Sequence, residues 1–410
     1  MMLHFGQPAK LKTKRIVFED VFAVCDSATL EQLKELTAKR RAIEECINES
    51  SCITEAIARE MSGGLVSRIE QDLYKIEQYL PLLENLFFHV EAIGNNHRMV
   101  QWTSSLKIRW SSAVSSSSIF NLMGPKFFQI DNLRFELGMT HFLYAAILRD
   151  RAFEVLSTDL VQSATLFREA AGIYHYLAHD ILPPLQPVLP SEKPPEALAA
   201  ISTIMSLICL AEAQAVTIRK AEEKGSSSSL LAKLHHGVTL FLNEAIGVLN
   251  TVIREYKDIL SCLSEFISYC KSLHELKGQK YFAVSLKASG EIGAAIGVLR
   301  STLINVKKKI PGEGSWNSIY QKEIDDASEV LRKFVYENDN VWREKIPAAD
   351  ELPLPQVAWW ASRKRSLSPL SCPAAMDNCD DSGSTNSEKK ETNFGTLHMI
   401  HGSAPDKWHI

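Results

Sequence analysis

The chain has 410 residues, of which 45% are hydrophobic and 23% charged, a composition typical of a folded globular protein. Its 45 Lys and Arg residues against 49 Asp and Glu residues give a formal net charge of −4, which argues against a nucleic-acid-binding protein. The eight cysteines form no CxxC pair, and no cluster of histidines lies beside them at zinc-ligand spacing. We therefore predict no bound metal, no structural disulfide and a cytoplasmic location.

Strand signals are scarce and lie in the first quarter of the chain. Residues 15–23 (RIVFEDVFA) alternate apolar and polar side chains, which predicts a strand or one arm of a small N-terminal β-hairpin. Residues 106–110 (LKIRW) alternate over a shorter stretch. Residues 1–15 lack the apolar centre of a signal peptide. Neither alternating stretch suffices for a sheet domain, because an isolated hairpin needs a surface to pack on.

Helical periodicity dominates the rest of the chain. From residue 30 to residue 47 apolar side chains recur at spacings of three, four and seven, behind the candidate N-caps Ser27 and Thr29. Residues 66–93 continue as helix, with Pro81 expected to break or restart it. The stretch 197–211 is uncharged but shorter than the roughly 20 residues of a membrane span, so we predict a buried helix there. The other predicted helices cover residues 132–155, 159–179, 196–223, 230–256, 259–276, 280–289, 291–309 and 318–335.

One segment has the character of a tetratricopeptide-like helical hairpin. Ala283 and Ala288 precede a turn at Gly290, and Ala294 and Ile296 follow it, so that two antiparallel helices can pack closely. No strict 34-residue period recurs elsewhere. Beyond residue 351 the chain becomes rich in Ser, Asn, Asp, Lys and Pro, which predicts one helical domain over residues 1–360 and a disordered tail over residues 361–410.

Motifs for catalysis are absent from the sequence. It contains no Walker loop, GxGxxG, HExxH or GxSxG string, so we predict a non-catalytic protein without a cofactor. His235 and His236 are neighbours that point about 100° apart on a helix, which favours a surface pair. His175 and His179 have chelating spacing, but no further histidine and no cysteine accompanies them in the sequence, and we predict no metal site there.

Several strings together resemble the Bro-domain family. Residues 211–221 (AEAQAVTIRKA) and 230–234 (LLAKL) resemble the family's signature strings at the same separation. Residues 170–177 (AAGIYHYL) with 182–185 (LPPL), Trp110, and residues 338–342 (NDNVW) with 345–347 (KIP) match further family segments in the same order. The resemblance covers residues 11–355, and length and opening resemble the short, Brox-type members.

This resemblance implies an all-α, elongated, banana-shaped helical solenoid with a tetratricopeptide-like core. It also implies an adaptor that binds the C-terminal amphipathic helix of an ESCRT-III filament subunit at endosomal or other remodelling membranes. The matching partner-binding positions are Leu230 and Leu234, one turn apart on a helix face, with Lys220 and Thr217 beside them. From periodicity alone Leu230 and Leu234 would be core residues, and only the resemblance favours a groove.

Departures from the family pattern limit what can be carried over. Thr217 stands where Alix-like relatives have a groove aromatic, so the pocket is expected to be shallower. Trp342 replaces a tyrosine. The last residues carry no cysteine and hence no prenylation box, so we expect indirect membrane association. Two alternatives stay open: a tetratricopeptide-like scaffold that binds an unrelated peptide, such as an acidic terminus held by basic residues, and a helical enzyme whose site forms only in the folded chain.

Overall fold

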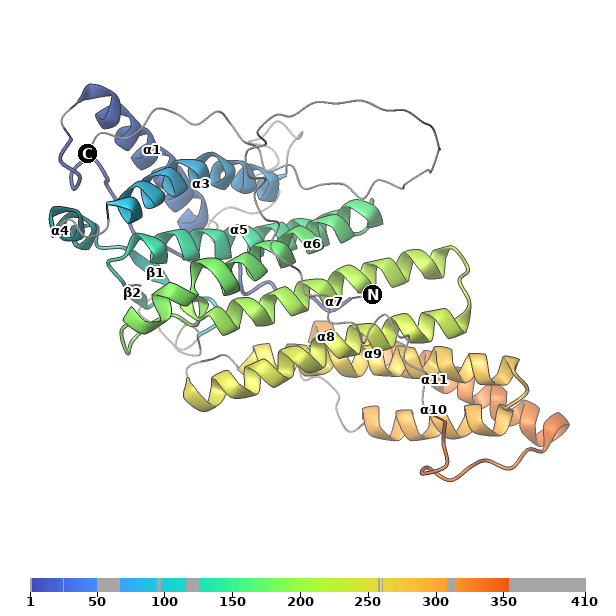
Figure 1. The fold of residues 1–410 in the computed structure, drawn as a ribbon. Helices are drawn as coiled ribbons and strands as arrows, with labels where there is room; N and C mark the ends of the chain where they lie inside the picture. The colour runs from blue at the N-terminus through green and yellow to red at the C-terminus, as the bar shows by residue number, and fades with distance from the viewer. Residues whose placement is uncertain are drawn as a thin grey trace, which may run out of the picture.

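Helices make up nearly all the regular structure of the computed structural model, which describes residues 2–24, 26–49, 67–93, 97–115, 125–256, 259, 261–307 and 314–353. Figure 1 shows the long helices stacked side by side, from α1 and α3 at one end to α10 and α11 at the other. The elements in chain order are α1 (Ser27–Glu49), α3 (Arg68–Ala92), α4 (His97–Ser105), β1 (Arg109–Ser111), β2 (Phe127–Gln129), α5 (Leu133–Val155), α6 (Leu160–Tyr176), η2 (Leu177–Ile181), η3 (Pro183–Val188), η4 (Pro195–Ala197), α7 (Ala199–Glu223), α8 (Ser228–Glu255), α9 (Ser261–Ala288), α10 (Ile292–Lys307), α11 (Gly314–Glu337) and η5 (Asn338–Trp342).

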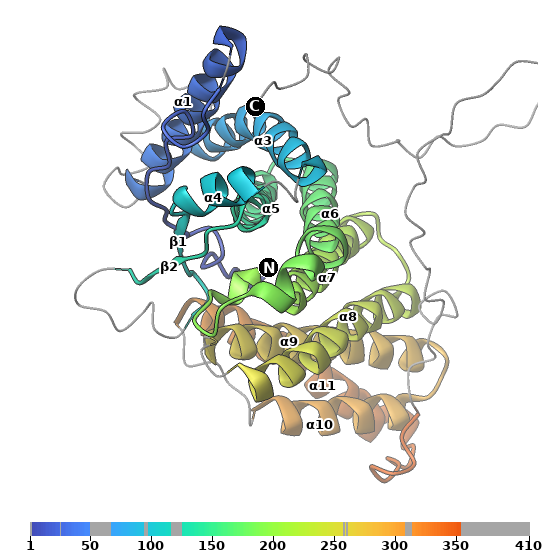
Figure 2. The ribbon, with the colours of Figure 1, turned by 60° about the vertical axis from the view of Figure 1, so that its left-hand side comes forward.

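Each long helix packs on the next one along the chain. Contacts run from α5 to α6, α7, α8 and α9 in turn, and α10 and α11 pack on α9. A row in which each layer contacts its neighbours is a helical solenoid, and Figure 2 shows this row following a curve from α3 to α7. The predicted all-α, elongated solenoid is confirmed. The antiparallel α9–α10 pair, joined at Gly290 with φ of +88°, is the predicted tetratricopeptide-like hairpin.

The helices begin at the polar residues that their sequences offer. Asn132 caps α5 by accepting from the Arg134 N–H, and Asp159 caps α6 by accepting from two backbone N–H groups. The cap of α1 is Asp26, whose side chain accepts from the Thr29 N–H at 2.7 Å. The expectation of Ser27 or Thr29 as the N-cap was therefore wrong. Asp26, Ser27 and Thr29 are all residue types that cap helices, so residue type alone does not choose among them.

Two predicted helix breaks do not occur. Pro81 lies on the exposed side within the continuous helix α3, where it removes one backbone donor while its neighbours Leu80 and Leu83 remain buried in the core. The predicted helices 259–276 and 280–289 form the single helix α9. Gly278 lies inside it because α8 approaches closely: a Cβ atom at Gly278 would lie 3.2 Å from the Cβ of His235.

The predicted strand at residues 15–23 is also wrong. That segment is irregular, and its apolar side chains Ile16, Phe18 and Phe22 are buried against the helices without joining a sheet. The described strands are β1 and β2, an antiparallel pair in which Trp110 faces Phe128, and Thr13 adds an isolated bridge to Trp110. The shorter alternation at residues 106–110 therefore overlaps a real strand, and the pair lies later in the chain than expected.

A buried carboxylate joins the first helices and the strand pair. Glu136, 0% exposed on α5, accepts hydrogen bonds from Arg40 Nε at 2.5 Å, Trp110 Nε1 at 2.6 Å and the Tyr79 hydroxyl at 3.1 Å. These donors come from α1, β1 and α3. Because a buried charge is stable only when it is paired and hydrogen-bonded, this cluster fixes how the four elements meet.

Two of the long helices, α7 and α8, are strongly apolar. By length and composition α7 and α8 could each span a membrane, and 78% of the most apolar window of α7 and 39% of that of α8 are buried inside the protein. Core helices meet the same criterion, and the predicted buried helix at residues 197–211 lies largely within α7, with Cys209 a buried free thiol. The predicted disordered tail, residues 361–410, lies outside the described residues.

Candidate functional site

The four residues singled out in the sequence lie on the adjacent ends of α7 and α8. A short turn joins these antiparallel helices; Gly225 adopts φ of +68° in it, and Ser227 caps α8 by accepting from the Leu230 N–H. Lys220 and Leu230 are each five residues from Gly225, on opposite sides of the turn. Thr217 and Leu234 are eight and nine residues from it. Antiparallel pairing therefore sets Lys220 level with Leu230 and Thr217 level with Leu234.

The start of α8 presents an aliphatic face to solvent. The side chain of Leu230 is 44% exposed, and Leu234, one turn later, is half-buried and packs on the edge of the core. Leu231 and Val238, on the inner side of the same helix, are 4% and 1% exposed. Leu230 is thus a surface residue, and the periodicity-based reading of it as core is wrong, whereas Leu234 belongs partly to both core and surface.

The two residues on α7 border this face. Thr217 is exposed, and its hydroxyl donates to the carbonyl of Ala213 at 3.0 Å, so the hydroxyl is satisfied within its own helix. Lys220 is partly buried one turn further on. A threonine at this place fills less space than an aromatic ring would, which leaves the α7 side of the face shallow.

A third helix contributes residues that sequence reasoning did not assign to the site. Arg219 on α7 donates to the carbonyl of Leu156 at 3.3 Å, which brings the start of α6 beside the end of α7. There Val161 is 53% exposed. The backbone N–H groups of Gln162 and Val161, and the cation of Lys220, lower the pKa of Asp159. The capping role of Asp159 was readable from the sequence, but its proximity to Lys220 and the exposure of Val161 depend on packing between helices.

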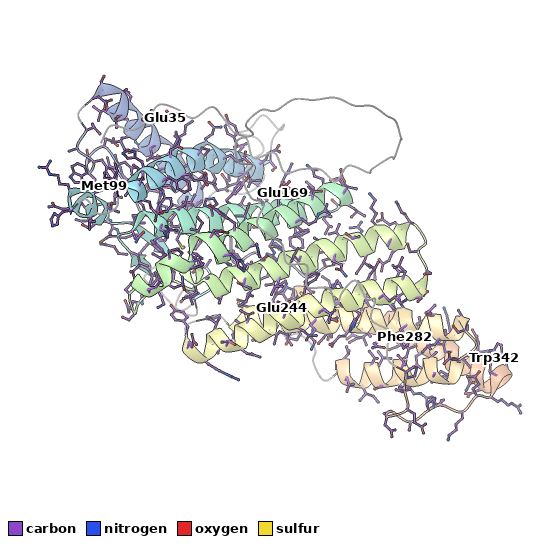
Figure 3. The ribbon with its side chains drawn as sticks, in the orientation of Figure 1. Glu35, Met99, Glu169, Glu244, Phe282 and Trp342 are labelled. Carbon is purple, nitrogen blue, oxygen red and sulfur yellow. The ribbon has the colours of Figure 1, made fainter. Side chains whose placement is uncertain are left out.

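We call these positions the binding edge: Asp159 and Val161 on α6, Thr217 and Lys220 on α7, and Leu230 and Leu234 on α8. In Figure 1 the start of α6 and the turn between α7 and α8 lie on the right-hand side of the helical row. Figure 3 labels Glu169 on α6 and Glu244 on α8 further along these helices, and Trp342 at the far tip of the row from Glu35 and Met99. The binding edge combines exposed aliphatic groups with one cation and one carboxylate.

A glutamine holds α8 in place at the binding edge. Gln214, in the middle of the AEAQA string on α7, donates its amide N–H to the carbonyl of Leu234 at 2.6 Å. Gly237 leaves the space that this side chain occupies, since a Cβ at that position would lie 2.3 Å from Gln214 Nε2. The string that signalled the family in the sequence therefore has a local physical role, which is to set the spacing and register of α7 against α8.

Beneath the binding edge lies a cluster of titratable groups. His235 is 2% exposed, so the expectation of a surface histidine pair at His235 and His236 is wrong for the first of them. Its Nε2 atom is 3.8 Å from the carboxylate of Glu222 on α7, which also accepts from the Tyr281 hydroxyl on α9 at 2.8 Å. His235 first, and then Tyr281, lower the pKa of Glu222 to about 2.

The remaining histidine pair does not form a ligand set. The rings of His175 and His179 are 4.0 Å apart between centroids, and the Nδ1 atom of His179 lies 2.8 Å from the carbonyl of His175. Across the described residues, no group of three or more His, Cys, Asp or Glu side chains is arranged to hold a metal ion. A cleft of about 380 Å³ between α3, α4 and the start of α5 is lined in part by Phe87, Val100 and Arg134, away from the binding edge.

Comparison with protein families places a model described as "BRO1-like domain" on residues 45–388. Two curated relatives match at low identity. The pH-response regulator protein palA/RIM20 of Emericella nidulans is 26% identical over 241 residues, which cover 55% of this chain and 26% of that protein. The human BRO1 domain-containing protein BROX is 24% identical over 268 residues, 60% of each protein. The chain thus spans a quarter of the first relative and three fifths of the second.

Solved structures share the fold at still lower identity. The complex of the ALIX BRO1 domain with CHMP4C superposes with a TM-score of 0.60 at 18% identity, covering 85% of this chain and 91% of that one. ALIX bound to the SIVmac239 PYKEVTEDL late domain gives a TM-score of 0.64 at 18% identity, covering 85% of this chain and 47% of that one.

Proposed function

The chain belongs to the BRO1-like domain family, and from that premise we propose that it is a non-catalytic adaptor whose binding edge receives the C-terminal amphipathic helix of an ESCRT-III subunit. We also propose that the protein is cytoplasmic and acts at endosomal or other remodelling membranes. Its support is the family, the similarity of fold to the ALIX BRO1 domain in a complex with CHMP4C, an ESCRT-III protein, and one observation on this chain. That observation is Leu230, an aliphatic side chain 44% exposed on the first turn of α8.

The geometry suits an amphipathic helix. Apolar side chains at i, i+3 and i+4 of a partner helix need aliphatic contacts spaced about one turn apart, and Leu230 and Leu234 have that spacing. Val161 extends the apolar contact toward α6, and Lys220 offers a cation to an acidic residue of the partner. A short helix that orders on binding pays conformational entropy, so we expect an affinity on the order of micromolar.

The alternative, a tetratricopeptide-like scaffold that holds an acidic peptide terminus, needs cations that are free to bind it. Lys277 and Lys280 on α9 both contact Glu323 on α11, at 3.0 Å and 3.2 Å. Lys287 is likewise paired with Glu337. Because these ammonium groups already have a carboxylate, we favour a partner recognised by aliphatic anchors.

The test is a titration with a fluorescent peptide from the C-terminal helix of an ESCRT-III subunit, with the wild type and three variants. Leu230→Asp should keep the melting temperature and weaken binding at least about tenfold, because a carboxylate would have to be desolvated against the apolar face of the peptide. Ile253→Asp, at a residue 40% exposed near the other end of α8, should change neither property. Leu231→Asp, at a residue 4% exposed, should lower the melting temperature sharply.

Three results would count against the proposal. A well-folded wild type that binds no such peptide removes the function, and Leu230→Asp binding as tightly as Ile253→Asp removes the site. Unfolding of Leu230→Asp together with that of Leu231→Asp would show that Leu230 stabilises the fold and would remove the argument that its exposed side chain is kept for a partner.

A further inference from the structure

Two histidines beneath the binding edge are joined by one hydrogen bond. His235 on α8 and His274 on α9 face each other with their Nδ1 atoms 3.0 Å apart. At that distance one Nδ1 donates and the other accepts, because two bare nitrogens or two N–H groups would repel. The Nε2 atom of His235 lies 3.8 Å from the Glu222 carboxylate, beyond hydrogen-bond distance, and the negative charge favours the His235 proton on that nitrogen. On that assignment His274 donates from Nδ1 and His235 accepts at Nδ1.

This array connects α9 to two of the helices that carry the binding edge, α7 and α8. Glu222 belongs to α7, His235 to α8, and His274 and Tyr281 to α9. The ring of Tyr281 stacks on that of His235, with centroids 5.7 Å apart and an interplanar angle of 12°. Gly278 lets α9 come within van der Waals distance of His235. His235 directly follows Leu234, so any shift of this histidine moves a residue of the binding edge.

We propose that the His235–His274 pair is a proton-sensitive support of the binding edge, holding α8 on α9 while both rings are neutral and releasing it when one of them is protonated. The part of this proposal that concerns partner binding rests on the proposed function. The part that concerns the α8–α9 contact does not.

An additional proton has no good place on the pair. On Nδ1 of His235 it would set two N–H groups against each other across 3.0 Å. On the outer nitrogen of His274 it would create a cation near the cation of Lys277. The carboxylate of Glu212 lines a small cavity together with His274, but it is already paired with Arg149 and so does not compensate that charge. Among the described residues, the charged or titratable groups around the pair include Glu222 on α7, Lys277 and Tyr281 on α9, and Glu323 on α11, with Glu212 and Cys270 on the cavity that His274 lines.

The sign of the pH dependence follows from these neighbours. Burial, and then the charges of His235 and Lys277, lower the pKa of His274. Burial also lowers the pKa of His235, because it outweighs the opposite effect of Glu222 and Glu323. A histidine whose pKa is lowered by folding contributes stability that is complete above its unfolded pKa of about 6.5 and is lost as the pH falls toward its folded pKa. The support is therefore intact at neutral pH and weakens in mild acid.

The experiment measures peptide binding and amide hydrogen exchange of the full chain at about pH 7.5 and about pH 5.5, on either side of the unfolded histidine pKa. The variant His274→Asn keeps an amide N–H that can donate to His235 but cannot titrate, and His236→Asn is the matched control next to the pair. In the wild type and in His236→Asn we expect binding at least about threefold weaker in acid, and faster exchange in α8 and α9 after correction for the intrinsic rate. His274→Asn should lose both responses.

The outcomes separate the two proposals. If the wild type binds no peptide at either pH but its exchange in α8 and α9 rises in acid only while His274 is present, the support stands and the proposed function fails. If the wild type binds equally well at both pH values, or His274→Asn responds to acid as the wild type does, the support is refuted. Should His274→Asn fail to fold, His274→Gln takes its place, and unchanged exchange of the wild type in acid is refutation by itself.

Discussion

Replacing Glu136 should strongly destabilise the first half of the solenoid. Its carboxylate is 0% exposed and accepts from Arg40, Trp110 and Tyr79, which lie on three other elements. Glu136→Gln keeps the shape of the side chain but removes the charge, and it leaves the guanidinium of Arg40, 1% exposed, without a counter-ion. Breaking a buried ion pair from one side typically costs about 3–5 kcal/mol, against about 1 kcal/mol for an ordinary hydrogen bond.

Local opening free energies from amide hydrogen exchange are the suitable assay, because a long solenoid need not unfold in one step. We expect Glu136→Gln to lower the opening free energy of α5 amides by about 3 kcal/mol or more, with little change in α10 and α11. Tyr79→Phe, which removes only the 3.1 Å bond, should lower it by about 1 kcal/mol.

The double variant Arg40→Met/Glu136→Leu tests the cause. Replacing both charges by apolar groups removes the uncompensated cation, so the double variant should be more stable than Glu136→Gln. If Glu136→Gln lies within about 1 kcal/mol of the wild type, or if the double variant is no better than the single one, the reasoning from an unpaired buried charge is wrong.

Three further changes have definite expected results. Gly237→Ala places a Cβ against Gln214 and should break its bond to the Leu234 carbonyl, lowering the melting temperature and weakening peptide binding together in a titration. Thr217→Phe should tighten peptide binding several-fold, because a ring adds apolar contact on the shallow side of the binding edge; unchanged affinity would place that position outside the contact. Pro81→Ala should raise the melting temperature, since it restores a backbone donor on the exposed side of α3, and a lower value would mean that the ring itself packs usefully.

Much of the fold was predictable because helical periodicity is a local signal. The strong apolar repeat of α5 to α8, and the proline and glycine stops after α6 and α7, located these helices within a few residues. Local rules failed where tertiary contacts decided the outcome. Pro81 and Gly278 look like breaks in isolation, but packing on both sides keeps α3 and α9 continuous. The alternation in residues 15–23 signalled burial correctly and strand incorrectly, since burial against helices produces the same pattern.

The candidate site shows a different limit. The resemblance singled out Leu230, Leu234, Lys220 and Thr217, and the structure brings them together across one turn, while their role in binding stays a prediction. Asp159, Val161 and the Glu222–His235–His274 array were not predicted, because they come from helices that meet only in the folded chain. No spacing rule connects residue 235 to residue 274, whereas a motif within one helical hairpin can be read directly from the string.

The start of α8 explains why periodicity alone could not separate core from site. Leu230 and Leu231 are the same residue type at consecutive positions, yet one is 44% exposed and the other 4%, because a helix turns by about 100° from one residue to the next. Both faces of this helix therefore carry aliphatic residues, one for α7 and α9 and one for solvent. An exposed aliphatic face stays soluble when it is small and interrupted, and Thr217 and Lys220 interrupt it here. A partner can contact Leu230 on this face without disturbing the packing of the helices, whereas Leu231, one position later, packs inside the solenoid and stabilises it. The substitutions Leu230→Asp and Leu231→Asp differ by one place in the chain, and the opposite outcomes expected for them follow from this geometry alone.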